Sequence, residues 1–169
     1  MNPWGYHTPT DYLEAARSSR SSDELTFLAS APYDFVRLAV ARNPHVTPTI
    51  LRDLVPQGFA TWNQQELAGA IAVNPKTPHD ALRAVALGLR QYLDFGRGTE
   101  MAGYAAVEIC DTPHVPLEFI KLLIAPTETS PRIRKKIANN CSRRDVLALL
   151  LSDTSEAVRT RAQRALEKI

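Results

Sequence analysis

The sequence predicts an all-α protein, an α-solenoid built from repeated pairs of short helices. Three observations lead to this prediction. An Asn-Pro pair recurs where one apolar helical pattern stops, a Thr-Pro pair or a capping box recurs where the next begins, and the two signals return together along the chain. One pair of helices of this length cannot bury its own apolar face, so consecutive pairs are expected to stack. The whole chain, residues 1–169, is interpreted as a single domain.

Two helices are predicted before the first repeat, within residues 9–30. The first covers about residues 11–17. The second begins at Ser22, a residue type that caps helices well, and continues to Ala29. These helices would lead the chain into the first complete repeat.

The clearest repeat covers residues 32–55. Its first helix has one apolar face, formed at the i, i+3 and i+4 positions by Val36, Ala39 and Val40. Pro44 disfavours the helical conformation of Asn43, so this helix is expected to stop at Asn43. Thr47 can then cap a second helix, in which Pro48 suits the first position.

Three further repeats and a final helix are predicted at about residues 64–86, 101–124, 130–151 and 154–168. The second repeat places its apolar residues and its Asn-Pro pair 31 residues after those of the first. The third has a looser register, because Glu108 falls where the first repeat has Ala39. In the fourth, Cys141 stands in the place of the proline, and residues 142–145 retain a capping box.

The pattern Val-Arg-x-x-Val-Ala-x-Asn-Pro at residues 36–44 resembles the variant leucine-rich repeat, an all-α relative of HEAT and armadillo repeats. The resemblance covers residues 32–55 and 67–85 well and the later repeats in part. It implies a right-handed superhelix of paired short helices, and the roles in this family are mostly unassigned or those of interaction proteins. The first known member of this family carries an iron–sulfur cluster on a cysteine-rich N-terminal segment. The first cysteine here is Cys110, so that cofactor is not expected.

Composition and hydropathy favour a cytoplasmic protein that does not enter a membrane. Hydrophobic residues make up 44% of the chain and charged residues 22%, as in ordinary globular proteins. The first ten residues show no signal-peptide pattern, and the apolar run at residues 146–151 is too short to span a bilayer. Cys110 and Cys141 are interpreted as two buried free thiols, with a disulfide as the alternative.

No catalytic residue, metal site or cofactor is predicted, so the protein is interpreted as a non-enzyme. The common nucleophile, zinc and nucleotide motifs are absent from the sequence. His45, His79 and His114 recur one repeat apart, and packed helices lie about 10 Å apart, too far to share a metal with bonds of about 2 Å. Acids near the starts of second helices, such as Asp80 and Asp145, are explained by helix capping.

Two insertions interrupt the repeats, at about residues 56–65 and 86–103. Insertions in solenoids map to loops on one face, which is often the binding face. The candidate partner-binding residues in these insertions are Phe59, Trp62, Tyr92, Phe95 and Arg97. Aromatic side chains make good anchors in protein interfaces. The alternative is that the aromatic residues fold back and fill the core where a repeat is irregular.

The charge is unevenly distributed along the chain. Residues 1–129 contain 10 Lys and Arg and 14 Asp and Glu, a net charge of −4, whereas residues 130–169 contain 10 and 4, a net charge of +6. The candidate basic patch comprises Arg132, Arg134, Lys135, Lys136, Arg143, Arg144, Arg159 and Arg161, with Arg164 extending it. Such a patch can bind phosphates or an acidic protein. In the alternative interpretation, Arg134 and Arg159 pair with acids of neighbouring repeats.

These observations predict a non-enzymatic interaction or scaffold module that binds a protein partner through the solenoid face and its inserted loops. The alternative is a nucleic-acid-binding, HEAT-like protein that uses the basic C-terminal repeats. The sequence leaves the partner's identity and the oligomeric state open.

Overall fold

The computed structural model describes residues 3–94 and 100–169, and over these ranges the chain forms eleven α-helices and no strand. The prediction of an all-α protein is confirmed. The helices are α1 (Pro9–Ser18), α2 (Ser22–Ala29), α3 (Asp34–Arg42), α4 (Pro48–Asp53), α5 (Trp62–Val73), α6 (His79–Arg90), α7 (Glu100–Asp111), α8 (Leu117–Leu123), α9 (Pro131–Asn140), α10 (Arg144–Leu150) and α11 (Glu156–Leu166). Within the described residues, no helix combines the length and the apolar character needed to cross a membrane.

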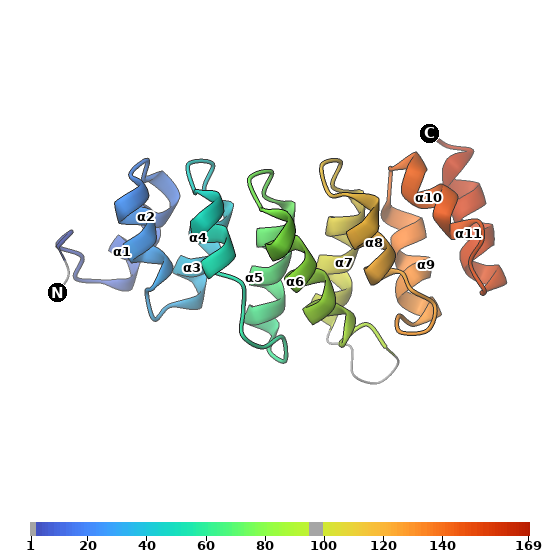
Figure 1. The fold of residues 1–169 in the computed structure, drawn as a ribbon, viewed down its shortest axis with the longest axis horizontal. Coiled ribbons are helices and arrows are strands. Elements are labelled where there is room, and N and C mark those ends of the chain that lie inside the picture. The colour runs from blue at the N-terminus through green and yellow to red at the C-terminus, as the bar shows by residue number, and fades with distance from the viewer. Residues whose placement is uncertain (1–2, 95–99) are drawn as a thin grey trace.

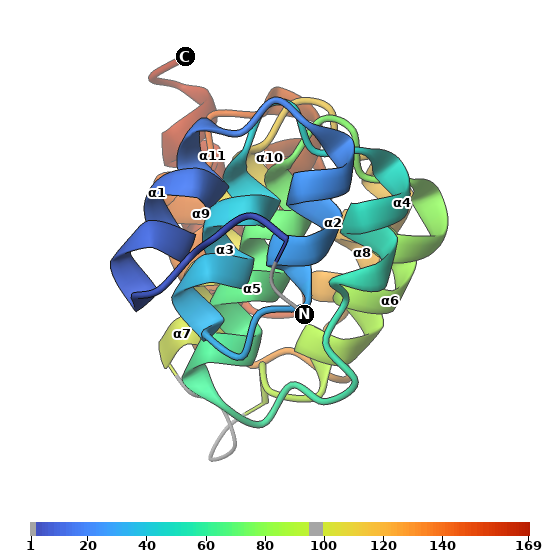
Figure 2. The ribbon, with the colours of Figure 1, turned by 90° about the vertical axis from the view of Figure 1, so that its left-hand side faces the viewer.

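The helices form two rows. The odd-numbered helices contact one another in the order α1, α3, α5, α7, α9 and α11, and the even-numbered helices contact one another in the order α2, α4, α6, α8 and α10. Figure 1 shows the helix pairs following each other along the long axis of the molecule. Viewed from the N-terminal end in Figure 2, most of the even-numbered helices lie to one side of the odd-numbered row. Each pair therefore has a neighbour on which to bury its apolar face.

The starts of the helices agree only partly with the sequence analysis. The Thr47 hydroxyl accepts a hydrogen bond from the Ile50 amide, with Pro48 in the first turn, as expected. The capping box predicted at residues 142–145 is wrong, because α10 begins after Arg143, which provides no side-chain cap. Pro78, which precedes α6, provides no side-chain cap either. Thr77 is buried and donates its hydroxyl hydrogen to the Ile71 carbonyl instead.

The Asn-Pro pairs end the helices where the sequence predicted, and their asparagines join successive odd-numbered helices. The Asn43 side-chain amide donates to the carbonyls of Ala16 (2.9 Å) and Ser19 (3.0 Å) at the end of α1. The Asn74 amide donates in the same way to the Ala41 carbonyl at the end of α3 (2.9 Å). Each Asn oxygen also accepts a backbone N–H two residues later, so donor and acceptor are both used.

The fourth repeat departs from the predicted register by one residue at this link. Cys141, and not Asn140, caps the C-terminus of α9, because the helix continues through Asn140. The Cys141 thiol donates to the Cys110 carbonyl at 3.5 Å, the contact that an asparagine amide makes in the earlier repeats. Both cysteines are buried and free, as predicted, and burial raises the pKa of the Cys110 thiol.

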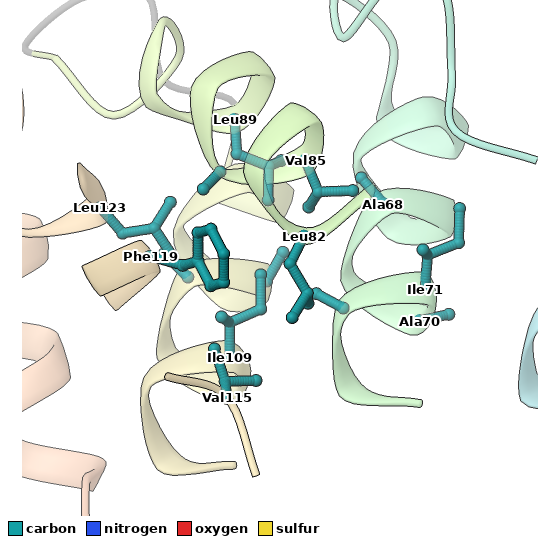
Figure 3. Packing of buried hydrophobic residues seen from close by; sticks show 14 of the residues in the cluster. Ala68, Ala70, Ile71, Leu82, Val85, Leu89, Ile109, Val115, Phe119 and Leu123 are labelled. Carbon is teal, nitrogen blue, oxygen red and sulfur yellow. The ribbon is translucent and has the colours of Figure 1, made fainter. Parts of the chain in front are cut away.

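Side chains from both rows fill the space between them and form one apolar cluster along the molecule. Figure 3 shows its central part, where α6 and α8 face α5 and α7. The buried residues labelled there are Ala68, Ala70, Ile71, Leu82, Val85, Leu89, Ile109, Val115, Phe119 and Leu123. Small residues let the odd-numbered helices approach closely at α5 and α7, since a Cβ on Gly69 would lie 3.1 Å from the Ala105 Cβ. The fully buried Leu51 agrees with the apolar stripe expected for α4.

Candidate interaction surfaces

Phe59, in the first insertion, is folded against the protein and does not form a free anchor. Its ring packs over Gly88 of α6, where any added Cβ would overlap the ring. The buried Gln65 side chain donates a hydrogen bond to the Phe59 carbonyl at 2.7 Å and fixes the backbone. The half-buried ring covers the absent side chain of Gly88. A partner-binding role for Phe59 stays a prediction.

Trp62, three residues later, remains exposed. It is the first residue of α5, and 49% of its surface is accessible. A capping box holds the backbone here. The backbone N–H of Gln64 donates to the Thr61 hydroxyl (3.3 Å), and the backbone N–H of Thr61 donates to the Gln64 side-chain oxygen (3.0 Å). The first insertion therefore presents one large aromatic side chain on a fixed helix start.

A polar groove of about 250 Å³ lies beside this helix start, between α3, the end of α4 and α5. Asn63, the neighbour of Trp62, lines it and donates to the Asp34 carboxylate at 2.6 Å. Asp34 also pairs with Arg37. Asp53 lines the same groove, is exposed, and forms no ion pair within the described ranges.

A second groove, of about 320 Å³, runs between α2 and α4 and shares Ala29, Asp53 and Leu54 with the first. The two grooves thus meet at the end of α4. The sequence predicts neither groove, because the groove walls come from four different helices, α2, α3, α4 and α5. The recurring spacing shows that these helices exist but not how their ends are placed relative to one another.

In the second insertion, the first residues remain helical, because α6 continues to Arg90. Tyr92 is half-buried and packs against the core, and Leu93 is fully buried. The Leu93 carbonyl accepts a hydrogen bond from the Ser130 amide at 2.9 Å, which connects the segment to the start of α9. Phe95 and Arg97 lie outside the described residues. The Tyr92 side chain therefore mainly packs against the hydrophobic core.

Arg134 is not part of a basic surface, because the residue is 1% exposed. Its guanidinium contacts both carboxylate oxygens of Asp153, at 2.7 and 2.9 Å. Burial alone would raise the pKa of Asp153, but hydrogen bonds from Arg134 and from the Ser155 amide lower it below its ordinary value. The alternative interpretation is correct for this residue: Arg134 pairs with an acid at the start of the next repeat.

Two other arginines of the predicted patch also bind neighbouring turns. Arg143 donates to the carbonyls of Thr112 (2.6 Å) and Val115 (2.8 Å) and pairs with Asp145. Arg159 donates to the Asp153 carbonyl at 2.8 Å, and its positive charge also lowers the pKa of the Asp153 carboxyl. In both cases the guanidinium group joins backbone segments, which limits its contact with an external ligand.

The rest of the predicted patch is divided between three helices. The exposed cations are Arg132 and Lys135 on α9, Arg144 on α10 and Arg161 on α11, together with Arg164 on α11. Lys136 is half-buried, and its ammonium nitrogen lies 3.4 Å from the centre of the Tyr104 ring on α7. The two helices that carry four of these cations, α9 and α11, pack directly against each other.

The histidines lie apart from any metal-binding group. His45 and His114 are exposed, and His79 lies 3.9 Å from the Glu118 carboxylate and contacts the edge of Phe119. Among residues 3–94 and 100–169, no three His, Cys, Asp or Glu side chains lie close enough to hold a metal ion together.

Comparison of the chain with protein-family models, with curated proteins and with solved structures gives no match. The resemblance of residues 36–44 to the variant leucine-rich repeat therefore stays a prediction. The surface around Trp62 combines an exposed aromatic residue, a fixed backbone and a groove lined by the next two residues of α5.

Proposed function

We propose that this protein is a non-enzymatic interaction module, an α-solenoid of HEAT-like, variant leucine-rich repeats that binds a protein partner in the cytoplasm. The repeat interpretation is supported by the two rows of helices, in which each member contacts the next of its row. It is also supported by Asn43 and Asn74, which make the same link in consecutive repeats. Stacked repeats of this kind provide extended surfaces for binding.

The observation that carries the binding proposal is the exposure of Trp62 on a capped helix start, next to Asn63 and Gln64, which line the first groove. Tryptophan is enriched among the few residues that dominate the free energy of protein interfaces. A side chain on a fixed backbone loses less conformational entropy on binding than one on a free loop. Asp53 and Asn63 add polar groups that can orient a partner around this anchor.

Replacement of Trp62 tests this proposal. If Trp62 is a central anchor, Trp62→Ala should lower the affinity for the partner by about 2 kcal/mol or more, about 30-fold. The immobilised protein is incubated with nuclease-treated cytosolic extract, and the retained proteins are compared between variants. Trp4→Ala is the matched control, because Trp4 is also exposed but lies before α1.

The expected result is a protein retained by the wild type and by Trp4→Ala but lost with Trp62→Ala. Thermal unfolding should be nearly the same for wild type and Trp62→Ala, because substitutions of exposed residues usually change stability by less than about 0.5 kcal/mol. Equal recovery with Trp62→Ala would contradict the proposal, as would the absence of any specifically retained protein.

Nucleic-acid binding is the second candidate function. The observation that favours it is the group of exposed cations on α9 and α11, two helices in direct contact. Arg134, Arg143 and Arg159 are engaged within the protein, so only a few phosphates could be neutralised. A fluorescent single-stranded and a double-stranded oligonucleotide are titrated at increasing salt. If four cations each neutralise a phosphate, a plot of the logarithm of the binding constant against the logarithm of the salt concentration should have a slope of about −3 to −4. No binding at low salt would exclude this function.

A further inference from the structure

A groove of about 350 Å³ is open between α1 and α3, whereas the later helices of the same row approach each other closely. At the position of Leu38 in the repeat, α5 has Gly69, and a Cβ there would lie only 3.1 Å from Ala105 of α7. A Cβ on Gly103 of α7 would lie 2.9 Å from Ile133 of α9. Between α1 and α3, the larger Leu13 and Leu38 line the space instead.

The walls of this groove are mainly apolar. On α3, the lining residues follow the i, i+3, i+4, i+7 spacing of a single helix face: Phe35, Leu38, Ala39 and Arg42. Phe35 is 44% exposed, while Leu13, Leu38 and Ala39 are half-buried. The Phe35 ring stacks on Tyr33 with 5.5 Å between ring centres, and Tyr33 contacts the edge of Tyr12. The contact with Tyr33 therefore holds the exposed Phe35 ring in position.

Positive charge is concentrated at one end of the groove. Arg17 lies in the last turn of α1 and Arg42 in the last turn of α3, and both line the groove. Arg42 lies 3.3 Å from the Glu66 carboxylate, but Arg17 is exposed and forms no ion pair within residues 3–94 and 100–169. Arginine in a last turn also suits the helix dipole, and this role leaves the guanidinium group accessible.

We propose that the groove between α1 and α3 binds a segment of a partner protein that presents a bulky apolar side chain to Phe35 and Leu38 and a carboxylate to Arg17. The apolar walls favour a protein segment over a polyphosphate, and the free guanidinium group selects an acidic residue next to the apolar one. The volume lies near the lower end of the range of about 300–1,000 Å³ found for ligand sites. This inference rests on the proposed function as a protein-binding module.

The test uses two blocked tripeptides as probes, N-acetyl-Phe-Leu-Glu-amide and its neutral counterpart N-acetyl-Phe-Leu-Gln-amide. Each is titrated into the full-length, ¹⁵N-labelled protein, and amide chemical shifts are followed by NMR. We expect shifts confined to α1 and α3, with the acidic peptide binding about two- to fivefold more tightly, as for a partly exposed charge pair.

Three variants separate the two parts of the site. Arg17→Gln should remove the preference for the acidic peptide and leave the affinity for the neutral one unchanged. Phe35→Ala should weaken both peptides. Arg20→Gln is the matched control, because Arg20 is exposed in the connection between α1 and α2 and does not line the groove; it should change neither affinity.

Three results would overturn the inference. Chemical-shift changes that cluster around Trp62 and leave α1 and α3 unchanged would show that the peptides bind near Trp62 and not in this groove, a result that still agrees with the proposed function. Equal affinities for the two peptides would refute the role of Arg17. No shift with either peptide would refute the groove as a site, while the capture experiment with Trp62→Ala would still decide on the proposed function.

Discussion

Arg134 and Asp153 form a buried ion pair between α9 and the connection that precedes α11. From the sequence, Arg134 has the same repeat position as Arg37 and Arg159. All three donate to a backbone carbonyl five or six residues upstream, at Thr129, Ala31 and Asp153. Only Arg134 is fully buried. Its burial depends on an acid 19 residues later in the chain, so the repeat pattern predicts the position of the arginine but not whether it is available to a ligand.

Arg134→Ala is expected to destabilise the protein by about 3–5 kcal/mol, because the carboxylate of Asp153 would stay buried without its partner. Arg132→Ala, an exposed neighbour on the same helix, should change the free energy of unfolding by less than about 0.5 kcal/mol. Urea denaturation measures both values. A loss below about 1 kcal/mol for Arg134→Ala would show that the pair is solvated.

The same pair predicts a dependence on pH. The pKa of Asp153 in the folded state is below its ordinary value of 3.8, so its contribution to stability is present above that value. The contribution is lost as the pH falls through 3.8 towards the lower folded pKa. The free energy of unfolding of the wild type should therefore fall more steeply on acidification than that of Asp153→Asn. Parallel curves for the two proteins would contradict this assignment.

At the scale of helices, the asparagine links explain why the Asn-Pro pair recurs. The proline stops the helix, and the asparagine side chain then connects the end of that helix to the end of the preceding one in the row. The sequence predicts the stop from proline alone, since that effect is local. It does not predict the link, whose partner lies 27 residues away for Asn43 and 33 for Asn74. For this reason the sequence aligns Cys141 with the proline of the earlier repeats, whereas in the structure Cys141 takes the place of the asparagine, one residue out of register.

Asn74→Ala should cost about 1–3 kcal/mol, because the Ala41 carbonyl and the Lys76 amide would each lose a hydrogen-bond partner. Cys141→Ala should cost less, since a thiol is a weak donor and its contact with the Cys110 carbonyl is 3.5 Å long. Chemical denaturation of the two variants under the same conditions tests the order. A larger loss for Cys141→Ala would mean that burial of the sulfur outweighs the link.

At the scale of the whole molecule, local sequence signals account for the helices, and non-local packing accounts for the surfaces. The all-α class and the ends of α3 and α5 follow from proline positions and apolar spacing, which act within a few residues. The roles of Phe59 and Trp62 could not be separated in this way. They lie three residues apart in one insertion, and only the approach of Gly88 from α6 decides that the first is covered and the second is exposed.

The uneven charge of the chain has a similar explanation. The net charge of +6 over residues 130–169 suggested a continuous basic patch. In the folded protein, Arg134, Arg143 and Arg159 bind carbonyls and acids of neighbouring segments, and Lys136 covers Tyr104. Much of this charge is therefore used in contacts between the last repeats and not on a continuous surface.

Site-specific photo-crosslinking at position 62 tests the proposed protein-binding role most directly. Trp62 is replaced by the photoreactive aromatic residue benzoylphenylalanine, and the protein is irradiated in cytosolic extract. The same residue at Arg83, exposed on α6, provides the control. The binding proposal predicts a discrete protein adduct from position 62 and none from position 83. No adduct at position 62, or the same adducts from both positions, would contradict it.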